Sequence, residues 1–298
     1  MTHAVRFVAA VAVLVALGVD APVQAQTPEI DALRVRAEAG DAIAQNNLGL
    51  IYDNGEGVPE DVAEAARWFR LAADQGDAEA QFNLGIMYDR GQGVPQDAAE
   101  AVRWYRLAAD QGLANAQFNL GFMYASGDGV PQDHTEAMRW YRLAADQGYA
   151  EAQGMLGSLY AMGIVVPADQ TEAVRWWRLA ADQGLASAQY TVGSMYEIGR
   201  GLPQDPAEAM RWYRLAADQG VARAQSILGS KYLSGDGVPQ DYIEAHMWYN
   251  LAASRLTGAI RDSLIQSRDR VADELTPDEL SEAQRLAREW DAAHPREP

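Results

Sequence analysis

The stretch RLAADQG occupies residues 70–76, and it recurs without change at 106–112, 142–148, 178–184 and 214–220. Successive copies are always 36 residues apart. A fixed period of roughly 20 to 50 residues indicates a solenoid or propeller, in which one supersecondary unit is repeated. The heptapeptide therefore predicts a repeat fold, in which each unit packs mainly against its neighbours.

The same period extends to residues outside the heptapeptide, and no residue is inserted or deleted between copies. Glycine, tyrosine, proline and tryptophan return in all six copies, as at Gly49, Tyr52, Pro59 and Trp68 of the first. Each copy is therefore expected to fill the same space. The six predicted repeats are residues 41–76, 77–112, 113–148, 149–184, 185–220 and 221–256.

The second copy illustrates how one repeat is expected to form a helical hairpin. Ala80, Leu84 and Tyr88 follow each other at intervals of four residues, which places them on one face of a first helix. The glycines and the proline of DRGQGVP then favour a turn. Asp97 and Glu100 have the spacing of a capping box, which predicts the start of a second helix.

The heptapeptide is predicted to form the joint between hairpins. Gly112 stands where a helix commonly ends in a left-handed residue. Gly85 lies inside the first helix, where a glycine costs about 1 kcal/mol. A bulky neighbour is therefore expected to press on its backbone, either the pair Trp104 and Tyr105 or the equivalent pair of an adjacent hairpin. Gln81 is expected to bond a loop or a helix end at the same seam.

The two ends of the chain do not follow the repeat. Residues 1–25 combine Arg6 in a short charged region, an apolar run and the small residue Ala25, which predicts a secretory signal peptide. The apolar run is shorter than the roughly 20 residues of a spanning helix. Cleavage after Ala25 would leave no integral membrane segment, so we expect a periplasmic or secreted protein. Residues 26–40 and 257–298 are expected to form helical caps over the first and last hairpins.

Composition argues against several kinds of site. The net charge of −18 disfavours nucleic acid, because an acidic surface repels a polyanion. The chain has no cysteine, which excludes disulfides, thiolate zinc sites, a cysteine nucleophile and the lipid anchor of a lipoprotein. His134, His246 and His294 are widely separated in the repeat frame, so neither a metal site nor a serine triad is expected. We therefore predict no cofactor and no enzymatic activity.

The pattern A-x-A-Q-x-x-L-G-x-x-Y-x-x-G-x-G-V-P-x-D-x-x-E-A-x-x-W-Y-x-x-A-A-x-x-G at 78–112 resembles the Sel-one-like repeat, a longer relative of the tetratricopeptide repeat. Six consecutive copies cover 41–256. The resemblance implies a right-handed α/α superhelix of helical hairpins, which the family uses to bind proteins or to assemble complexes. Many bacterial members are exported. Cysteine-rich members staple each hairpin with a disulfide and have been linked to penicillin binding, an activity that a chain without cysteine does not inherit from the resemblance.

The first helix of each hairpin has four positions that change between copies while their neighbours stay constant. Their spacing of i, i+3, i+7 and i+10 places them on one helix face. In superhelices of this type the first helices line the concave surface. These positions supply the candidate partner-binding residues, with the alternative that the same rings fill gaps between repeats. The candidates are Phe82, Ile86, Phe118, Phe122 and Tyr190.

The fourth copy departs from the others in its loop. It reads GIVVP at 163–167, with Val165 where the other copies have glycine. The loop is expected either to tuck against its hairpin or to offer Ile164, Val165 and Val166 as an apolar contact point.

Together these observations predict an exported, non-catalytic scaffold that binds a protein or peptide partner on its concave face. The alternative is a protein that binds or processes a cell-wall component, peptidoglycan or another glycan, with aromatic rings as stacking platforms. The sequence offers no catalytic constellation for the processing version of this alternative.

Overall fold

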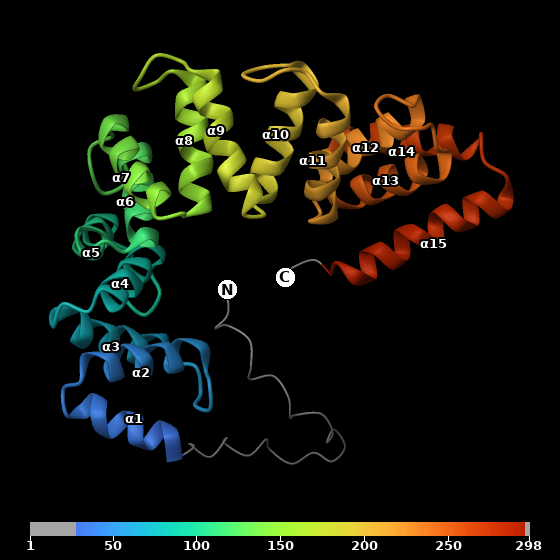
Figure 1. Ribbon diagram of the computed structural model, residues 1–298. Coiled ribbons are helices and arrows are strands. Elements are labelled where there is room, and N and C mark those ends of the chain that lie inside the picture. The colour runs from blue at the N-terminus through green and yellow to red at the C-terminus, as the bar shows by residue number, and fades with distance from the viewer. Residues whose placement is uncertain (1–27, 296–298) are drawn as a thin grey trace, which may run out of the picture. The chain divides into compact units, whose positions relative to one another are not determined.

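The structure is a computed structural model that describes residues 28–295, so the predicted signal peptide at 1–25 lies outside the described residues. Within the described range the chain forms fifteen α-helices and no β-strand, which confirms the all-α repeat fold (Figure 1). The helices are α1 (Pro28–Glu38), α2 (Ala42–Asn54), α3 (Val62–Asp74), α4 (Ala78–Arg90), α5 (Ala98–Asp110), α6 (Ala114–Ser126), α7 (His134–Asp146), α8 (Ala150–Met162), α9 (Gln170–Asp182), α10 (Ala186–Ile198), α11 (Pro206–Asp218), α12 (Ala222–Ser234), α13 (Tyr242–Arg255), α14 (Gly258–Ala272) and α15 (Pro277–Ala293).

The helices belong to two compact units. The first unit, Met1–Gln96, is described from residue 28 and contains α1 to α4, each packed against the next. The second unit, Asp97–Pro298, is described as far as residue 295 and contains α5 to α15. In the second unit each helix from α5 to α13 packs against its successor, and α13 also contacts both α14 and α15 (Figure 1). Within each unit the core is therefore a continuous series of contacts between sequence neighbours, as in other repeat arrays.

Each second helix begins at an aspartate, as the sequence predicted. In α5 the Asp97 carboxylate accepts hydrogen bonds from the backbone N–H groups of Ala99 and Glu100, both at 3.0 Å. Such a cap contributes on the order of 1 kcal/mol. The Glu100 carboxylate pairs with Arg103 rather than completing a capping box. A complete capping box occurs at the start of α15 instead, between Thr276 and the third helical residue.

The heptapeptide ends the second helices α3, α5, α7, α9 and α11, which confirms its predicted role as a joint. Gly112 has a left-handed φ of +95°, and its N–H donates to the Ala109 carbonyl at 2.9 Å. The next N–H, of Leu113, donates to the Ala108 carbonyl at 3.2 Å. These two bonds form a Schellman motif, which satisfies carbonyl groups that the helix leaves free.

The repeated glutamines connect these joints to the first helices. Gln117 Nε2 donates to the Ala109 carbonyl, at the end of the preceding helix, at 3.1 Å. Gln147, the sixth residue of a heptapeptide copy, donates from Nε2 to Gln117 Oε1 at 2.8 Å. The prediction that the first-helix glutamine bonds a helix end is therefore confirmed, and the glutamine of RLAADQG acquires a reason for its recurrence.

Both ends of the array are covered by helices. At the first hairpin, Ile30 and Ala37 of α1 are buried in one cluster with Leu48 and Trp68. At the last hairpin, Leu251 is only 2% exposed, whereas its counterpart Leu215 in the preceding copy is 38% exposed.

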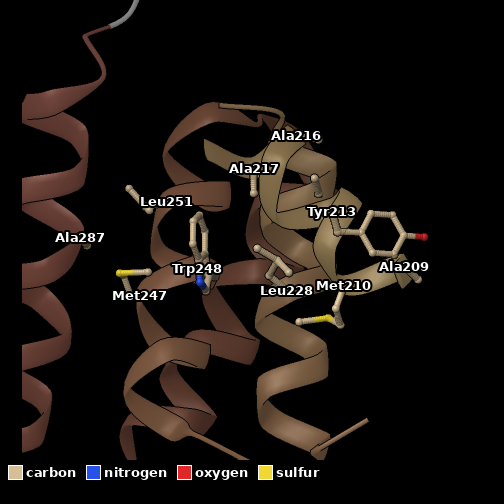
Figure 2. Packing of buried hydrophobic residues seen from close by; sticks show 11 residues of the cluster. Ala209, Met210, Tyr213, Ala216, Ala217, Leu228, Met247, Trp248, Leu251 and Ala287 are labelled. Carbon is tan, nitrogen blue, oxygen red and sulfur yellow. The ribbon is translucent and has the colours of Figure 1, made fainter. Parts of the chain in front are cut away.

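The cover of the last hairpin is α15, which packs on α13. Figure 2 shows Ala287 of α15 on the side to which Leu251 and Met247 project, and the three belong to one buried cluster. The sixth copy reads HMWYN at 246–250, where the fifth reads MRWYR at 210–214. Met247 thus stands where an arginine stands in the fifth copy, and it gives α15 an apolar surface to cover.

No helix between residues 28 and 295 combines the length and the apolar character that crossing a membrane requires.

Candidate protein-interaction surface

The five residues predicted to bind a partner lie on three different first helices. Phe82 and Ile86 are on α4 of the first unit, and both are half-buried. Phe118 and Phe122 are on α6 of the second unit, and Tyr190 is on α10. Phe122 is 51% exposed, whereas Phe118 and Tyr190 are half-buried. The two aromatic residues of α6 therefore have different surroundings although they are one helical turn apart.

Phe118 contributes both to the core edge and to the surface. Its ring lies 5.6 Å from the ring of Tyr141 and 5.3 Å from that of Tyr149, centroid to centroid. Tyr190 packs in the same way, 5.8 Å from the ring of Tyr213. Tilted aromatic pairs at these separations are favourable beyond the area that they bury. Phe118 and Tyr190 therefore pack against the core and can still be reached by a partner, so the two roles predicted for these rings are compatible.

A pocket of ≈ 310 Å³ opens on the variable face between α6, α8 and α10. Its apolar walls are the side chains of Phe118, Met155, Trp177 and Leu185. Polar residues complete the lining, and they come from α8 and α10. These are Glu151, Ser158, Ser187 and Thr191.

The pocket exists because α8 has a glycine where neighbouring first helices have an aromatic ring. Gly154 occupies the position that Phe118 takes in α6 and Tyr190 takes in α10. The indole of Trp177 approaches from α9, and its Nε1 donates to the Gly154 carbonyl at 3.1 Å. The pocket is therefore lined by α8 at Gly154 and by the indole of Trp177.

Two hydroxyl groups of the lining, those of Ser158 and Thr191, already have hydrogen-bond partners. Ser158 Oγ donates to the Gly154 carbonyl at 3.1 Å, and Thr191 Oγ1 donates to the Ser187 carbonyl at 2.9 Å. Donors that are satisfied in this way add little to the recognition of a polar ligand. The pocket is therefore chemically apolar, although several of its residues are polar.

The one charged residue of the lining is Glu151. Its side chain is exposed, and it forms no ion pair within residues 28–295. Burial, with the Glu151 carboxylate as the second cause, raises the pKa of the neighbouring Tyr149. The rim of the pocket thus presents an unpaired negative charge.

A buried polar cluster connects α10 and α12. Lys231, the sole lysine of the chain, is 4% exposed, and its ammonium group lies 2.8 Å from both Glu197 Oε1 and Asp236 Oδ2. The other oxygen of Glu197 accepts a hydrogen bond from the Tyr213 hydroxyl at 2.5 Å. Burial, and then the Glu197 carboxylate, raise the pKa of Tyr213. These groups satisfy one another, so the cluster is a structural feature and not a free binding site.

In the part of the chain that the structure describes, no group of three or more His, Asp or Glu side chains could hold a metal ion. His246 is 3% exposed and lines a cavity of ≈ 430 Å³ with Arg268 of α14 and Arg288 of α15. Burial, and then the positive charge of Arg268, lower the pKa of His246. The Asp269 carboxylate lines the same cavity and opposes this shift.

The loop of the fourth copy is largely tucked in. Val165 and Val166 are half-buried and pack on the cluster that contains Leu156 and Leu159. Ile164 is 48% exposed. Only one of the three apolar side chains is therefore available to a partner.

Of the pocket residues, only Phe118 is among the five candidates predicted from the sequence, and none of the five lies on α8 of the fourth copy. The signal that could have found the pocket is a pair of exchanges. Glycine replaces an aromatic residue at Gly154, and tryptophan replaces tyrosine at Trp177. These two positions also contact each other in the third and fifth copies, as Phe118 with Tyr141 and as Tyr190 with Tyr213. A loss of volume at one and a gain at the other therefore indicate a local change in the shape of the surface.

Comparison with known proteins places the chain in a family. The model of the Sel1 repeat matches residues 42–77, 78–113, 114–149, 150–185, 186–221 and 222–255. No curated protein shows significant similarity to the chain.

Among solved structures, the chain is similar to a Sel1 repeat protein from Oxalobacter formigenes, with 35% sequence identity and a TM-score of 0.66. That match covers 76% of this chain and 87% of the other. The chain is also similar to c5321, a protective antigen of uropathogenic Escherichia coli strains that displays an SLR fold, with 26% identity, a TM-score of 0.41 and coverage of 89% and 79%. Because the matched repeats extend from 42 to 255, and because the Oxalobacter protein is 35% identical, the chain belongs to the Sel1 repeat family.

Proposed function

We propose that this protein is an exported, non-catalytic scaffold that binds a protein or peptide partner along the first helices of the second unit. Sel1 repeat proteins generally serve as protein-interaction scaffolds, which supports the coarse assignment. The observation that carries the finer assignment is the apolar pocket between α6, α8 and α10, together with the exposed ring of Phe122, one helical turn from the pocket residue Phe118. Anchor side chains of protein partners typically insert into pockets of this kind.

Site-specific photocrosslinking tests which surface meets the partner. A photoreactive phenylalanine analogue at residue 122 is compared with the same analogue at residue 143, in cells that produce the protein. Leu143 is a matched control, because it is an apolar side chain, 39% exposed, on the second helix α7. We expect a discrete protein adduct from residue 122 and none from residue 143. Equal adducts from both positions, or none from either, would contradict the proposed surface.

The alternative function is glycan binding, which the exposed ring of Phe122 favours because aromatic rings stack on sugars. Against it, the Ser158 and Thr191 hydroxyls of the pocket are already bonded to backbone carbonyls and offer little to a sugar. Cosedimentation with purified peptidoglycan distinguishes the two. We expect the protein to stay in the supernatant, and pelleting that depends on Phe122 would favour the glycan instead.

Export rests on the predicted signal peptide at 1–25. Mass spectrometry of the protein recovered from a bacterial periplasmic fraction is expected to identify Gln26 as the first residue. A chain that keeps Arg6 and is found with the membranes would argue against export as a soluble scaffold.

A further inference from the structure

Gly154 differs from the other glycines inside first helices, because no neighbouring side chain requires it. A Cβ atom built on Gly121, Gly157 or Gly193 would come within 2.5 to 2.9 Å of an aromatic ring. A Cβ on Gly154 would contact only Leu185 Cδ2, at an ordinary 3.4 Å. Glycine in a helix interior costs about 1 kcal/mol relative to alanine. At residue 154 this cost has no packing reason.

The space over Gly154 is the space that an aromatic ring fills in the adjacent copies. In the third copy Phe118 takes this position, and its ring lies 5.6 Å from that of Tyr141. In the fourth copy the larger indole of Trp177 faces the glycine, yet a pocket of ≈ 310 Å³ stays open. Trp177 therefore does not replace the volume that the absent side chain leaves.

The size and the walls of the pocket specify what it can hold. Buried cavities of about 150 Å³ with apolar linings accommodate benzene. A pocket of ≈ 310 Å³ walled by Phe118, Met155 and Leu185 is large enough for a phenyl, leucyl or methionyl side chain. Burial of such a group contributes roughly 25 cal/mol for each Å² of apolar surface removed from water.

The charge at the rim specifies what lies beside that side chain. Glu151 is exposed and unpaired within residues 28–295, and the whole chain has a net charge of −18. Complementary charge steers the encounter of two proteins and sets their register. A lysine or arginine adjacent to the anchor would meet the Glu151 carboxylate, whereas an acidic residue there would be repelled.

We infer that the pocket over Gly154 receives one bulky apolar side chain, of the size of Phe, Leu or Met, from an extended partner segment with a basic residue beside it. This inference rests on the proposed function and specifies the chemistry of the partner. Gly154 determines specificity because it leaves room for the anchor, and Glu151 does so because it selects the neighbouring charge.

Selection of short random peptides displayed on phage, with the purified protein as bait, tests the inference. The enriched peptides are synthesised, and their dissociation constants are measured for the wild type and for variants. Gly154→Phe with Trp177→Tyr recreates the Phe118–Tyr141 pair of the third copy, so it fills the pocket with an arrangement that the fold already contains. Gly154→Phe alone is the simpler filling variant, and Gly154→Ala is the control that leaves most of the pocket open.

We expect the enriched peptides to share Phe, Leu or Met next to Arg or Lys. The filling variants should bind these peptides at least about tenfold more weakly, because a buried anchor dominates the binding energy of small interfaces. Gly154→Ala should retain affinity. Glu151→Gln should weaken binding by about two- to fivefold at low ionic strength, and this loss should vanish at high salt.

The outcomes separate this inference from the proposed function. Enriched peptides that lack the motif, or that bind the filling variants as tightly as the wild type, would overturn the pocket while the scaffold function stands. An absence of any enrichment would overturn both.

Discussion

The ring of Tyr141 lies so close to the backbone of Gly121 that a Cβ atom at residue 121 would stand 2.9 Å from two ring carbons. The same relationship recurs between Gly49 and Phe69, at 2.6 Å. The ring belongs to the residue that follows the repeated tryptophan in the same hairpin. For the first helices α2, α6, α8, α10 and α12 this confirms the expectation that a bulky aromatic neighbour presses on the glycine. Of the aromatic pair, it is the second residue that makes the contact.

Gly121→Ala is therefore expected to destabilise the protein although alanine is the better helix former. The added methyl group would meet the Tyr141 ring at 2.9 Å and the Ala137 carbonyl oxygen at 3.2 Å. Overpacking of this kind costs about 1 to 3 kcal/mol, which outweighs a gain in helix propensity of about 1 kcal/mol.

Urea unfolding monitored by circular dichroism gives the comparison. Gly154→Ala is the matched control, because it makes the same change where the space is open, and we expect it to raise the free energy of unfolding by about 0.5 to 1 kcal/mol. Equal shifts for the two variants would show that the Tyr141 ring does not constrain Gly121.

The effects of Glu197 and Lys231 on the free energy of unfolding are expected to be coupled, because the two side chains form an ion pair. In the preceding pair of copies the same two positions are Ala125 and Leu159, so the array also accommodates an apolar version. Glu197→Ala leaves the buried ammonium of Lys231 with one partner, the exposed Asp236. Breaking a buried pair costs about 3 to 5 kcal/mol, and we expect about 2 because Glu197 is one-third exposed.

The double variant Glu197→Ala with Lys231→Met is expected to recover stability to within about 1 kcal/mol of the wild type, because a well-packed apolar pair often replaces a buried ion pair without loss. A double-mutant cycle of unfolding free energies measures the coupling. If the two single losses simply add, the cluster contributes no coupling and this interpretation is wrong.

Burial of His246 predicts a dependence of stability on pH. Its pKa is lowered in the folded protein by burial and by Arg268, against the opposing carboxylate of Asp269, and Arg288 lines the same cavity. The unfolded chain therefore binds a proton more readily, so stability is complete above the unfolded pKa of about 6.5 and is lost as the pH falls below it.

The loss can reach about 1.4 kcal/mol per pH unit for one proton. His246→Met, which installs the residue present at Met210 in the preceding copy, should flatten this part of the profile. Unfolding free energies of the two proteins at several values between about pH 5 and 8 provide the test. Parallel profiles would show that His246 does not titrate differently in the folded state.

The repeat fold could be predicted from sequence because every copy makes the same local contacts. The period located the joints, and structure places Gly112 and Gln117 in the roles expected for them. Helix starts were equally predictable, apart from the partner of Glu100, since an arginine three residues later competes for its carboxylate.

The candidate pocket could not be predicted in the same way, because it depends on the departure of a single copy from the pattern. Gly154 and Trp177 are 23 residues apart, and the pocket requires that the indole approach the α8 backbone without filling the space. The difference in exposure between Leu215 and Leu251 also could not be predicted, because it depends on a helix outside the repeats. Nothing at residue 251 itself indicates burial, since it is the folded-back α15 that covers this leucine.

Alanine substitutions of the two phenylalanines of α6 are expected to have different effects, one on stability and the other on binding. Phe118 packs against Tyr141 and Tyr149, so Phe118→Ala should lower the free energy of unfolding by about 2 to 3 kcal/mol, less than the 3 to 5 typical of a fully buried ring. Phe122 is 51% exposed, so Phe122→Ala should change stability by less than about 0.5 kcal/mol.

If the first helices of the second unit form the binding surface, Phe122→Ala should nevertheless weaken the binding of a selected peptide or crosslinked partner, because an exposed aromatic ring is available as an anchor. Leu143→Ala supplies the control, since it truncates a comparably exposed apolar residue on a second helix and should change neither stability nor binding. Melting curves and dissociation constants for the three variants together show whether the partner meets the first helices. If Phe122→Ala binds like the wild type while Leu143→Ala does not, the partner meets the second helices instead, and the variable face of α6, α8 and α10 is not the site.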